Sequence, residues 1–160
     1  MSAGLRIIEA GEADAARWDA YVEERGSFFH LFGWRRVIAR AYGYDASYLM
    51  AVRDGKVAGV LPLVDVKSPL FGRNLISTAF TVGGGLVADD AAAAQALAEA
   101  AVEQGKRRRA GYVELRGAPA PLGGWIVKRG VYAGFEFILP TDVSENLNRI
   151  PRRRRAEVRK

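Results

Sequence analysis

The sequence predicts a mixed α/β (α+β) fold, in which a mostly antiparallel sheet carries helices on both faces. Three observations point to this fold class: β-type and helical runs alternate, Asp54-Gly55 joins two β-type runs, and an Ala-rich helix divides earlier strands from later ones. The 160 residues are 49% hydrophobic, which is enough for one globular domain with its own core.

The first elements are expected to be one strand and two helices. Leu5–Glu9 is short and β-rich, and Glu12–Glu24 carries apolar residues at helical spacing. Gly33–Tyr42 is expected to form a second, amphipathic helix, whose apolar stripe consists of Trp34, Val37, Ile38 and Ala41.

A hairpin and a third strand should follow. Ser47–Arg53 and Lys56–Val66 are β-type runs on either side of Asp54-Gly55, a strong hairpin signal. Pro62 predicts a bulge or a sheet edge within the second run, because proline cannot donate to a β-ladder. Ser68–Gly72 is expected to be a loop and Leu75–Phe80 another strand.

The second half begins with a glycine-rich break and a long helix. Gly83–Gly85 precedes a short β-type pair, and Asp89 or Asp90 is expected to cap a helix that runs to about Gln104. The basic cluster Lys106–Arg109 suits the C-terminal end of that helix and is expected to be solvated. Further predictions are a strand at Tyr112–Arg116 and a hairpin over Trp125–Leu139 that turns at Gly130.

The C-terminal segment carries the whole formal charge of the chain, +6. Residues 149–160 hold seven Lys/Arg and one Glu, so 17 basic and 17 acidic residues remain elsewhere. Asp142 is a candidate N-cap for a helix that enters this segment, and Pro151 suits a first helical turn. We therefore expect residues 1–141 to form an N-terminal domain. Residues 142–160 should form the start of a basic helix that leads to a second domain.

Composition excludes several kinds of site. The chain has no cysteine, so disulfides, thiolate metal sites and a cysteine nucleophile are ruled out. No apolar run approaches about 18 residues, and the N-terminus lacks a long apolar stretch before its first charges. These features predict a cytoplasmic protein without a membrane span.

Four segments in this order resemble the FemAB-type branch of the GNAT-like N-acyltransferase superfamily, especially the FemAB-like proteins of bacterial exosortase (PEP-CTERM) systems. They are Phe28–Ile38, Ala51–Leu63, Tyr112–Arg116 and Ile150–Lys160. The resemblance implies a GNAT-like acyl-CoA N-acyltransferase fold and a protein built from two such domains, of which this chain is the first. It also implies transfer of an acyl or aminoacyl group, from an acyl-CoA or an aminoacyl-tRNA, to an amine of peptidoglycan or exopolysaccharide.

One segment departs from acetyl-CoA-dependent relatives of that superfamily. Those proteins carry a Gln/Arg-x-x-Gly-x-Gly/Ala loop at the start of the main helix, and residues 81–89 lack it. Acidic residues at the helix start would repel a pyrophosphate. Acetyl-CoA is therefore not the expected ligand of this half.

The candidate substrate-binding residues are His30, Trp34, Glu114, Arg116, Arg152 and Arg155. Trp34 aligns with a groove tryptophan of the family, but its place on an apolar stripe favours core packing, and a capping or packing role is favoured for His30 over an acid–base role. Glu114 and Arg116 share one face of a strand, as a site or as an ion pair. Arg152 and Arg155 would meet the second domain or an anionic cell-envelope precursor. No catalytic residue is assigned. Because an amine nucleophile needs only deprotonation and an oxyanion stabiliser, a transferase of this kind is expected to need no metal and no tightly bound cofactor.

Two other functions stay open at this level. The basic segment could bind RNA, including tRNA, or another anionic polymer, although it lacks the interleaved aromatic residues that stack on bases. The chain could also be a conventional acetyl-CoA N-acetyltransferase, which binding of acetyl-CoA would reveal.

Overall fold

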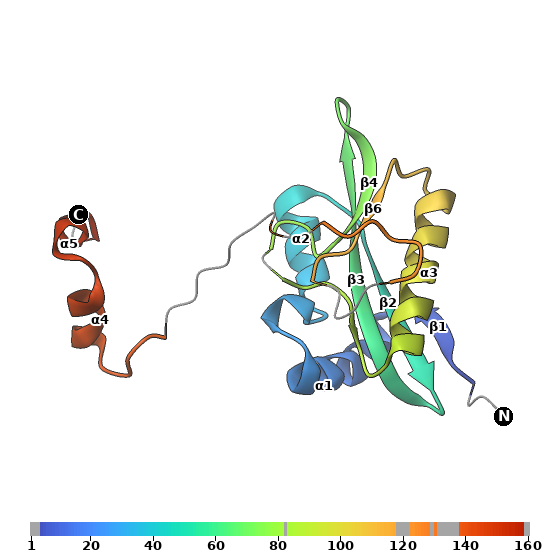
Figure 1. The fold of residues 1–160 in the computed structure, drawn as a ribbon, viewed down its shortest axis with the longest axis horizontal. Coiled ribbons are helices and arrows are strands. Elements are labelled where there is room, and N and C mark those ends of the chain that lie inside the picture. The colour runs from blue at the N-terminus through green and yellow to red at the C-terminus, as the bar shows by residue number, and fades with distance from the viewer. Residues whose placement is uncertain (1–3, 82, 118–121, 129, 131–137, 159–160) are drawn as a thin grey trace. The chain divides into compact units, whose positions relative to one another are not determined.

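The computed structural model describes residues 4–81, 83–117, 122–128, 130 and 138–158 (Figure 1). The chain divides into two compact units, 1–127 and 128–160. The first unit contains β1 (Arg6–Glu9), η1 (Glu12–Asp14), α1 (Ala15–Arg25), η2 (Phe28–His30), α2 (Trp34–Tyr42), β2 (Ala46–Arg53), β3 (Lys56–Ser68), β4 (Gly72–Ser77), β5 (Val87–Ala88), α3 (Ala91–Arg107) and β6 (Val113–Glu114). The second contains α4 (Val143–Arg149) and α5 (Arg152–Val158).

One sheet organises the first unit. Its strand order is β1-β2-β3-β4-β6, and β5 pairs with β3 beside this path. All the described pairings are antiparallel except β4 with β6. The predicted mixed, mostly antiparallel sheet is therefore confirmed.

The two central strands are apolar on both faces because both faces are covered. Alternate residues point to opposite sides of a strand, so each of these strands contributes side chains to a hydrophobic core on either face of the sheet. One core lies against α3 and includes Leu49, Ala51, Leu61, Leu63 and Leu75. The other lies against α1 and the segment after it and includes Tyr48, Met50, Val52 and Val60. Helices thus cover both faces, as predicted.

The buried face of helix α3 consists mostly of alanine, and its small side chains pack directly on the sheet. Ala93, Ala98 and Ala101 have no exposed area, and Leu97 contacts the strand at Gly59. A Cβ on Gly59 would lie 2.9 Å from the Leu97 Cδ1 atom. Glycine is therefore required at this point of β3 for helix and strand to touch.

The predicted Asp54-Gly55 turn is present, with φ of 50° and 78° at the two residues. Two successive positive φ values are those of a type I′ turn, which matches the twist of the flanking strands. The register between β2 and β3 shifts at Ala51/Val52 and not at Pro62, where β3 instead has a free edge because β4 ends at Ser77. The Pro62 carbonyl accepts from Thr78 N–H, so the proline nitrogen faces the place where β4 has ended and no donor is needed.

Several predicted boundaries were wrong. The strand expected over Leu75–Phe80 ends at Ser77, because Thr78 and Phe80 adopt positive φ values of 34° and 71°. The strand expected over Tyr112–Arg116 is reduced to Val113–Glu114.

The apolar stripe of α2 is only partly buried: Ile38 is 2% exposed, but Val37 is 46% exposed. The expected hairpin at Trp125–Leu139 lies largely outside the described residues.

The second unit contains two short helices where one helix was expected to enter the basic segment. Helix α4 ends at Arg149 and α5 begins at Arg152, with Ile150-Pro151 between them. Pro151 cannot donate within a continuing helix, which explains the break. No helix in the described part of the chain has the length and apolar character needed to cross a bilayer.

Candidate functional site

A break in the sheet creates the candidate site. Strand β3 pairs with β4 at one end and with β5 at the other, and residues 78–86 leave the sheet between them. We call this segment the 78–86 loop. The Thr78 hydroxyl donates to the Gly84 carbonyl, which holds the loop in a tight bend. The described part of the loop therefore has a defined shape.

His30 ties the loop to the segment before α2. The Ser27 N–H donates to His30 Nδ1 at 3.0 Å, so the ring proton is on Nε2, which donates to the Gly85 carbonyl at 3.1 Å. Burial lowers the pKa of His30, and this effect outweighs the hydrogen bond to the Gly85 carbonyl. A neutral imidazole with both nitrogens engaged acts here as a cap and a tether.

Arg116 fixes the other side of the loop. Its N–H donates to Ser77 Oγ at 2.8 Å, and its guanidinium contacts the Thr81 carbonyl at 3.5 Å. Its carbonyl oxygen lies directly against the Cα of Gly85, where a Cβ atom would overlap it. Arg116 also pairs with Glu114 at 2.7 Å. The pair therefore satisfies itself and positions the loop.

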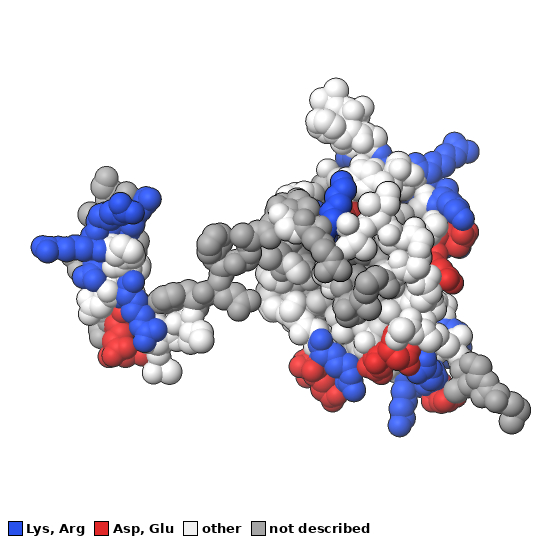
Figure 2. Space-filling view, in the orientation of Figure 1, with Lys and Arg blue, Asp and Glu red and all other residues white. Residues whose placement is uncertain are grey.

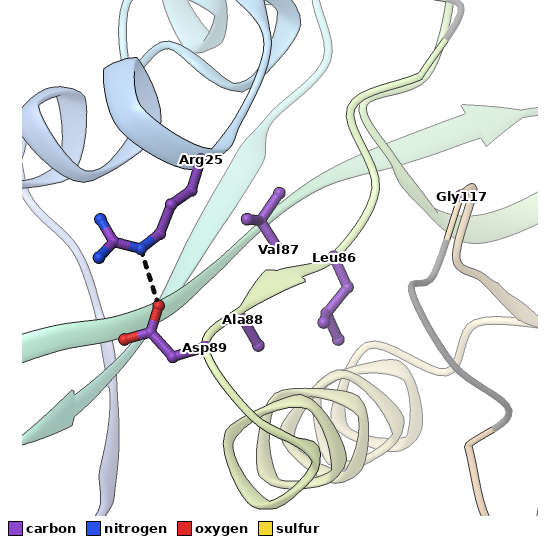
Figure 3. Close-up of a pocket in the computed structure, with 6 residues that line it drawn as sticks. All are labelled: Arg25, Leu86, Val87, Ala88, Asp89 and Gly117. Atoms are coloured by element: carbon purple, nitrogen blue, oxygen red, sulfur yellow. Dashed lines mark ion pairs between the residues drawn. The ribbon is translucent and has the colours of Figure 1, made fainter.

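An open pocket of about 720 Å³ lies where the loop returns to the sheet (Figure 3). Its lining residues are Arg25, Leu86, Val87, Ala88, Asp89 and Gly117. Figure 3 shows β5 along one side, the Arg25–Asp89 ion pair at one end, and Gly117 across from the strand. The pocket is thus bounded by strand edge, helix start and the chain after β6.

The pocket side of β5 presents backbone groups. Asp89 N–H donates to the Ala58 carbonyl, so Asp89 faces β3, and the alternation of an antiparallel ladder turns Ala88 the other way. Among the described strands β5 pairs with β3 alone. The Ala88 N–H and C=O therefore lie on the outer edge, where an extended ligand containing an amide can pair with them.

Two neighbouring carboxylates set the charge of the site. Asp89 Oδ1 accepts from Tyr21 Oη at 2.9 Å and from Arg25 Nε at 3.0 Å. Desolvation and the bond to Asp89 raise the pKa of Tyr21, so its hydroxyl stays protonated as a donor. Asp89 is therefore held at the pocket rim by a neutral donor and a cation.

Asp90 occupies the N-terminus of α3. Its Oδ1 accepts from Ala93 N–H at 2.8 Å, and its Oδ2 is 2.5 Å from Arg53 Nη1. The Arg53 hydrogen bond, with help from the Ala93 N–H, lowers the pKa of Asp90 to about 2. A fixed negative charge thus occupies the position at which a helix would otherwise bind a phosphate.

The predicted residues divide into three groups. His30 and Arg116 contact the 78–86 loop, and Glu114 is joined to it only through its ion pair with Arg116. Trp34 is separate: its Nε1 donates to the Phe28 carbonyl at 2.7 Å, and its ring packs on Phe28 and Phe29 in a partly exposed cluster outside the core.

Arg152 and Arg155 belong to the second unit. Arg155 donates to the carbonyls of Ile150 and Asn148 at 2.8 and 2.6 Å, which caps the end of α4, and Arg152 is exposed. Sequence reasoning missed Arg25 and the Ala88 backbone, because both enter the pocket through pairing that no local pattern specifies. The pair Asp89-Asp90 at the predicted start of the helix was the one sequence feature that pointed to the position of this pocket.

The described residues contain no group of three His, Asp or Glu side chains that could hold a metal ion. The groups available for a ligand are the Ala88 backbone, the Asp89 carboxylate and the Arg25 guanidinium. This set favours a ligand with amide groups and a positive charge over a diphosphate.

No protein-family profile and no curated protein matches the sequence. Solved structures do match. The ribosomal-protein-alanine N-acetyltransferase of Brucella melitensis biovar Abortus 2308 superposes with a TM-score of 0.54 and 14% identity, covering 86% of this chain and 100% of its own. A GNAT family acetyltransferase of Staphylococcus aureus subsp. aureus USA300_TCH1516 gives 0.51 and 12%, covering 84% and 98%. These likenesses show that the chain has the GNAT fold.

Proposed function

We propose that this chain with a GNAT fold is the acceptor-binding domain of a FemAB-type acyl or aminoacyl transferase that acts on a cell-envelope amine in the cytoplasm. The observation that carries the proposal is the Asp90 carboxylate at the N-terminus of α3. It fills the helix N-terminus that a diphosphate-bearing donor would need, while the adjoining pocket stays open to a cationic ligand.

The pocket suits an amine carried on a peptide-like chain. The Ala88 N–H and C=O can pair with an amide of the acceptor, as in the addition of a strand to a sheet edge. Asp89 Oδ1 is engaged by Tyr21 and Arg25, and its Oδ2 accepts no hydrogen bond from the described residues. That oxygen is available to an acceptor ammonium.

The contribution of this domain is positioning. In amine acylation the ammonium first loses a proton to solvent; the nitrogen then bonds to the acyl carbon, the bond to the donor's oxygen or sulfur breaks, and the leaving group takes up the second proton lost by the nitrogen. Holding both reactants in place supplies much of the rate enhancement in such a transfer. We assign the donor, an aminoacyl-tRNA or an acyl-CoA, to a second GNAT-like domain of the same polypeptide. The acceptor is then an anionic peptidoglycan or exopolysaccharide precursor.

The second candidate is a conventional acetyl-CoA N-acetyltransferase. It is favoured by the fold, because both structural neighbours described above are named as acetyltransferases. It requires the diphosphate of acetyl-CoA to bind beside Asp90, which the fixed carboxylate opposes.

Binding measurements separate the two candidates. The probes are acetyl-CoA, a peptidoglycan stem peptide with a free side-chain amine, and the same peptide with that amine acetylated. We expect calorimetry to show binding of the free-amine peptide alone. Asp89→Asn should weaken this binding about threefold to fivefold, the range of a partly exposed ion pair. Asp54→Asn is the matched control, because it removes a carboxylate from an exposed turn that also accepts asparagine. Stabilisation of the chain by acetyl-CoA, without binding of the peptide, would overturn the proposal.

A further inference from the structure

The tip of the β3–β4 hairpin exposes two large apolar side chains. Leu70 is 87% exposed and Phe71 is 82% exposed. Figure 1 shows the hairpin projecting beyond the rest of the first unit, and in Figure 2 its tip stands out as an uncoloured protrusion at the top of the view. Neither side chain contributes to the buried cores of this unit. The tip therefore has no evident role in folding.

Three backbone groups of the tip already have hydrogen-bond partners within the hairpin. Pro69 has no N–H, and the N–H groups of Leu70 and Phe71 both lie 3.3 Å from Ser68 Oγ. The Asn74 side-chain amide lies 3.5 Å from the Phe71 carbonyl. An unpaired backbone group is costly to remove from water, so internal pairing lowers the cost of moving this tip into an apolar medium.

Positive charge gathers at the base of the hairpin. Asp65, 1% exposed, is contacted by Lys67, Arg73 and Arg108 at the level of the hairpin stem. The backbone carbonyl of Arg73 accepts a hydrogen bond from the Gly111 N–H, which brings the segment after α3 next to the hairpin stem.

The exposed Arg107 and Arg109 lie at that helix end and make no ion pair with a described residue. The group therefore holds five cations, Lys67, Arg73, Arg107, Arg108 and Arg109, against the carboxylates of Asp45 and Asp65. Figure 2 shows blue side chains at the base of the tip and at the neighbouring end of the first unit. The tip thus projects from a surface of net positive charge.

We propose that the β3–β4 hairpin docks this protein on an anionic lipid bilayer, with Leu70 and Phe71 in the interface and Arg107 and Arg109 near the headgroups. Apolar residues that enter the interface, combined with basic residues at the headgroups, are the two elements of peripheral membrane binding. A projecting tip of two side chains is too small for a stable protein interface, and leucine does not stack on nucleic-acid bases. This inference does not depend on the proposed transferase function.

Sedimentation with vesicles tests the proposal. The full chain is mixed with vesicles of phosphatidylcholine alone or of phosphatidylcholine with phosphatidylglycerol. We expect binding to the anionic vesicles, and at least a tenfold loss of binding in the double variant Leu70→Ser, Phe71→Ser. Arg107→Gln with Arg109→Gln should weaken binding about tenfold and reduce its salt dependence. Ile126→Ser is the control for a lost exposed apolar residue, since Ile126 is 91% exposed and lies outside the hairpin.

A second readout reports insertion directly. Phe71→Trp should be quenched by brominated lipids in the anionic vesicles, above the level given by the native tryptophans. All the substituted side chains are exposed, so unchanged thermal unfolding confirms that each variant is folded.

Three outcomes would overturn the inference. The first is a wild-type chain that does not sediment with the anionic vesicles. The second is a tip variant that binds them as well as the wild type, which would assign binding to basic residues elsewhere, such as Arg152–Arg155. The third is tip-dependent dimerisation without vesicle binding, which would make the hairpin a contact between copies of the chain.

Discussion

Replacement of Gly85 by alanine tests the arrangement on which the candidate site depends. The new Cβ would overlap the carbonyl oxygen of Arg116, a backbone atom that no rotamer change can move. The Arg116 N–H is itself held by Ser77 Oγ at 2.8 Å. Either the chain after β6 or the 78–86 loop must therefore shift.

The expected loss follows from two terms. Overpacking against a fixed neighbour costs about 1–3 kcal/mol. A shift of Gly85 also stretches the bond from His30 Nε2 to its carbonyl, and leaving that buried pair unmade costs about 1–3 kcal/mol. We expect Gly85→Ala to lower the free energy of unfolding by about 2–6 kcal/mol, the sum of the two terms.

Urea unfolding followed by circular dichroism measures this change. Gly33→Ala is the control, because Gly33 has the helical φ of −59° and only the tip of the Arg36 side chain, 4.0 Å away, lies near the added Cβ. We expect the control to unfold within about 0.5 kcal/mol of the wild type or slightly above it. If Gly85→Ala matched the wild type equally well, the contact between Arg116 and the 78–86 loop would not exist as described.

Three further predictions concern the same unit. The chain has one histidine, so a proton NMR titration reads His30 directly; we expect a native pKa below 6.5, and stability that falls as the pH drops from about 6.5 towards that value, because the unfolded chain takes up the proton first. A native pKa at or above 6.5 would contradict the buried neutral ring. Asp65→Asn should cost about 1–3 kcal/mol at neutral pH, less than a fully buried pair because Arg73 and Arg108 remain partly exposed. Burial raises the pKa of Asp65, but the hydrogen bonds from Arg73 and Arg108 outweigh it and lower that pKa, so the difference in urea unfolding should shrink as the pH falls below 3.8 and the folded-state carboxylate becomes protonated. Leu97→Ala should cost about 2–5 kcal/mol in the same assay, since Leu97 has no exposed area, and a cost below 1 kcal/mol would place α3 elsewhere.

The fold class could be predicted because it depends on local patterns. The alternation of β-type and helical runs, the Asp54-Gly55 turn and the acidic start of α3 are all short-range signals, and each is present in the structure. The end of β4 could not be predicted, because Thr78 and Phe80 adopt positive φ values in a loop that residues distant in sequence hold. Propensity alone favours extended backbone for threonine and phenylalanine.

The candidate site was predicted only in part for the same reason. His30 and Arg116 stand out as a lone histidine and a charged strand residue, but their meeting point at the 78–86 loop is set by contacts across 55 and 35 residues. The Asp65 cluster went unrecognised, since Arg108 reaches it from 43 residues away. Only a folded sheet brings such partners together.

The division of β3 between two partners has a consequence for how this protein can change. Strand β3 runs unbroken past the gap, so it sets the register of β4 and of β5 separately. A change in the 78–86 loop can therefore alter the pocket without slipping either pairing, although the contacts with His30 and Arg116 limit which residues the loop accepts. The sheet supplies a frame whose register does not depend on the shape of the pocket.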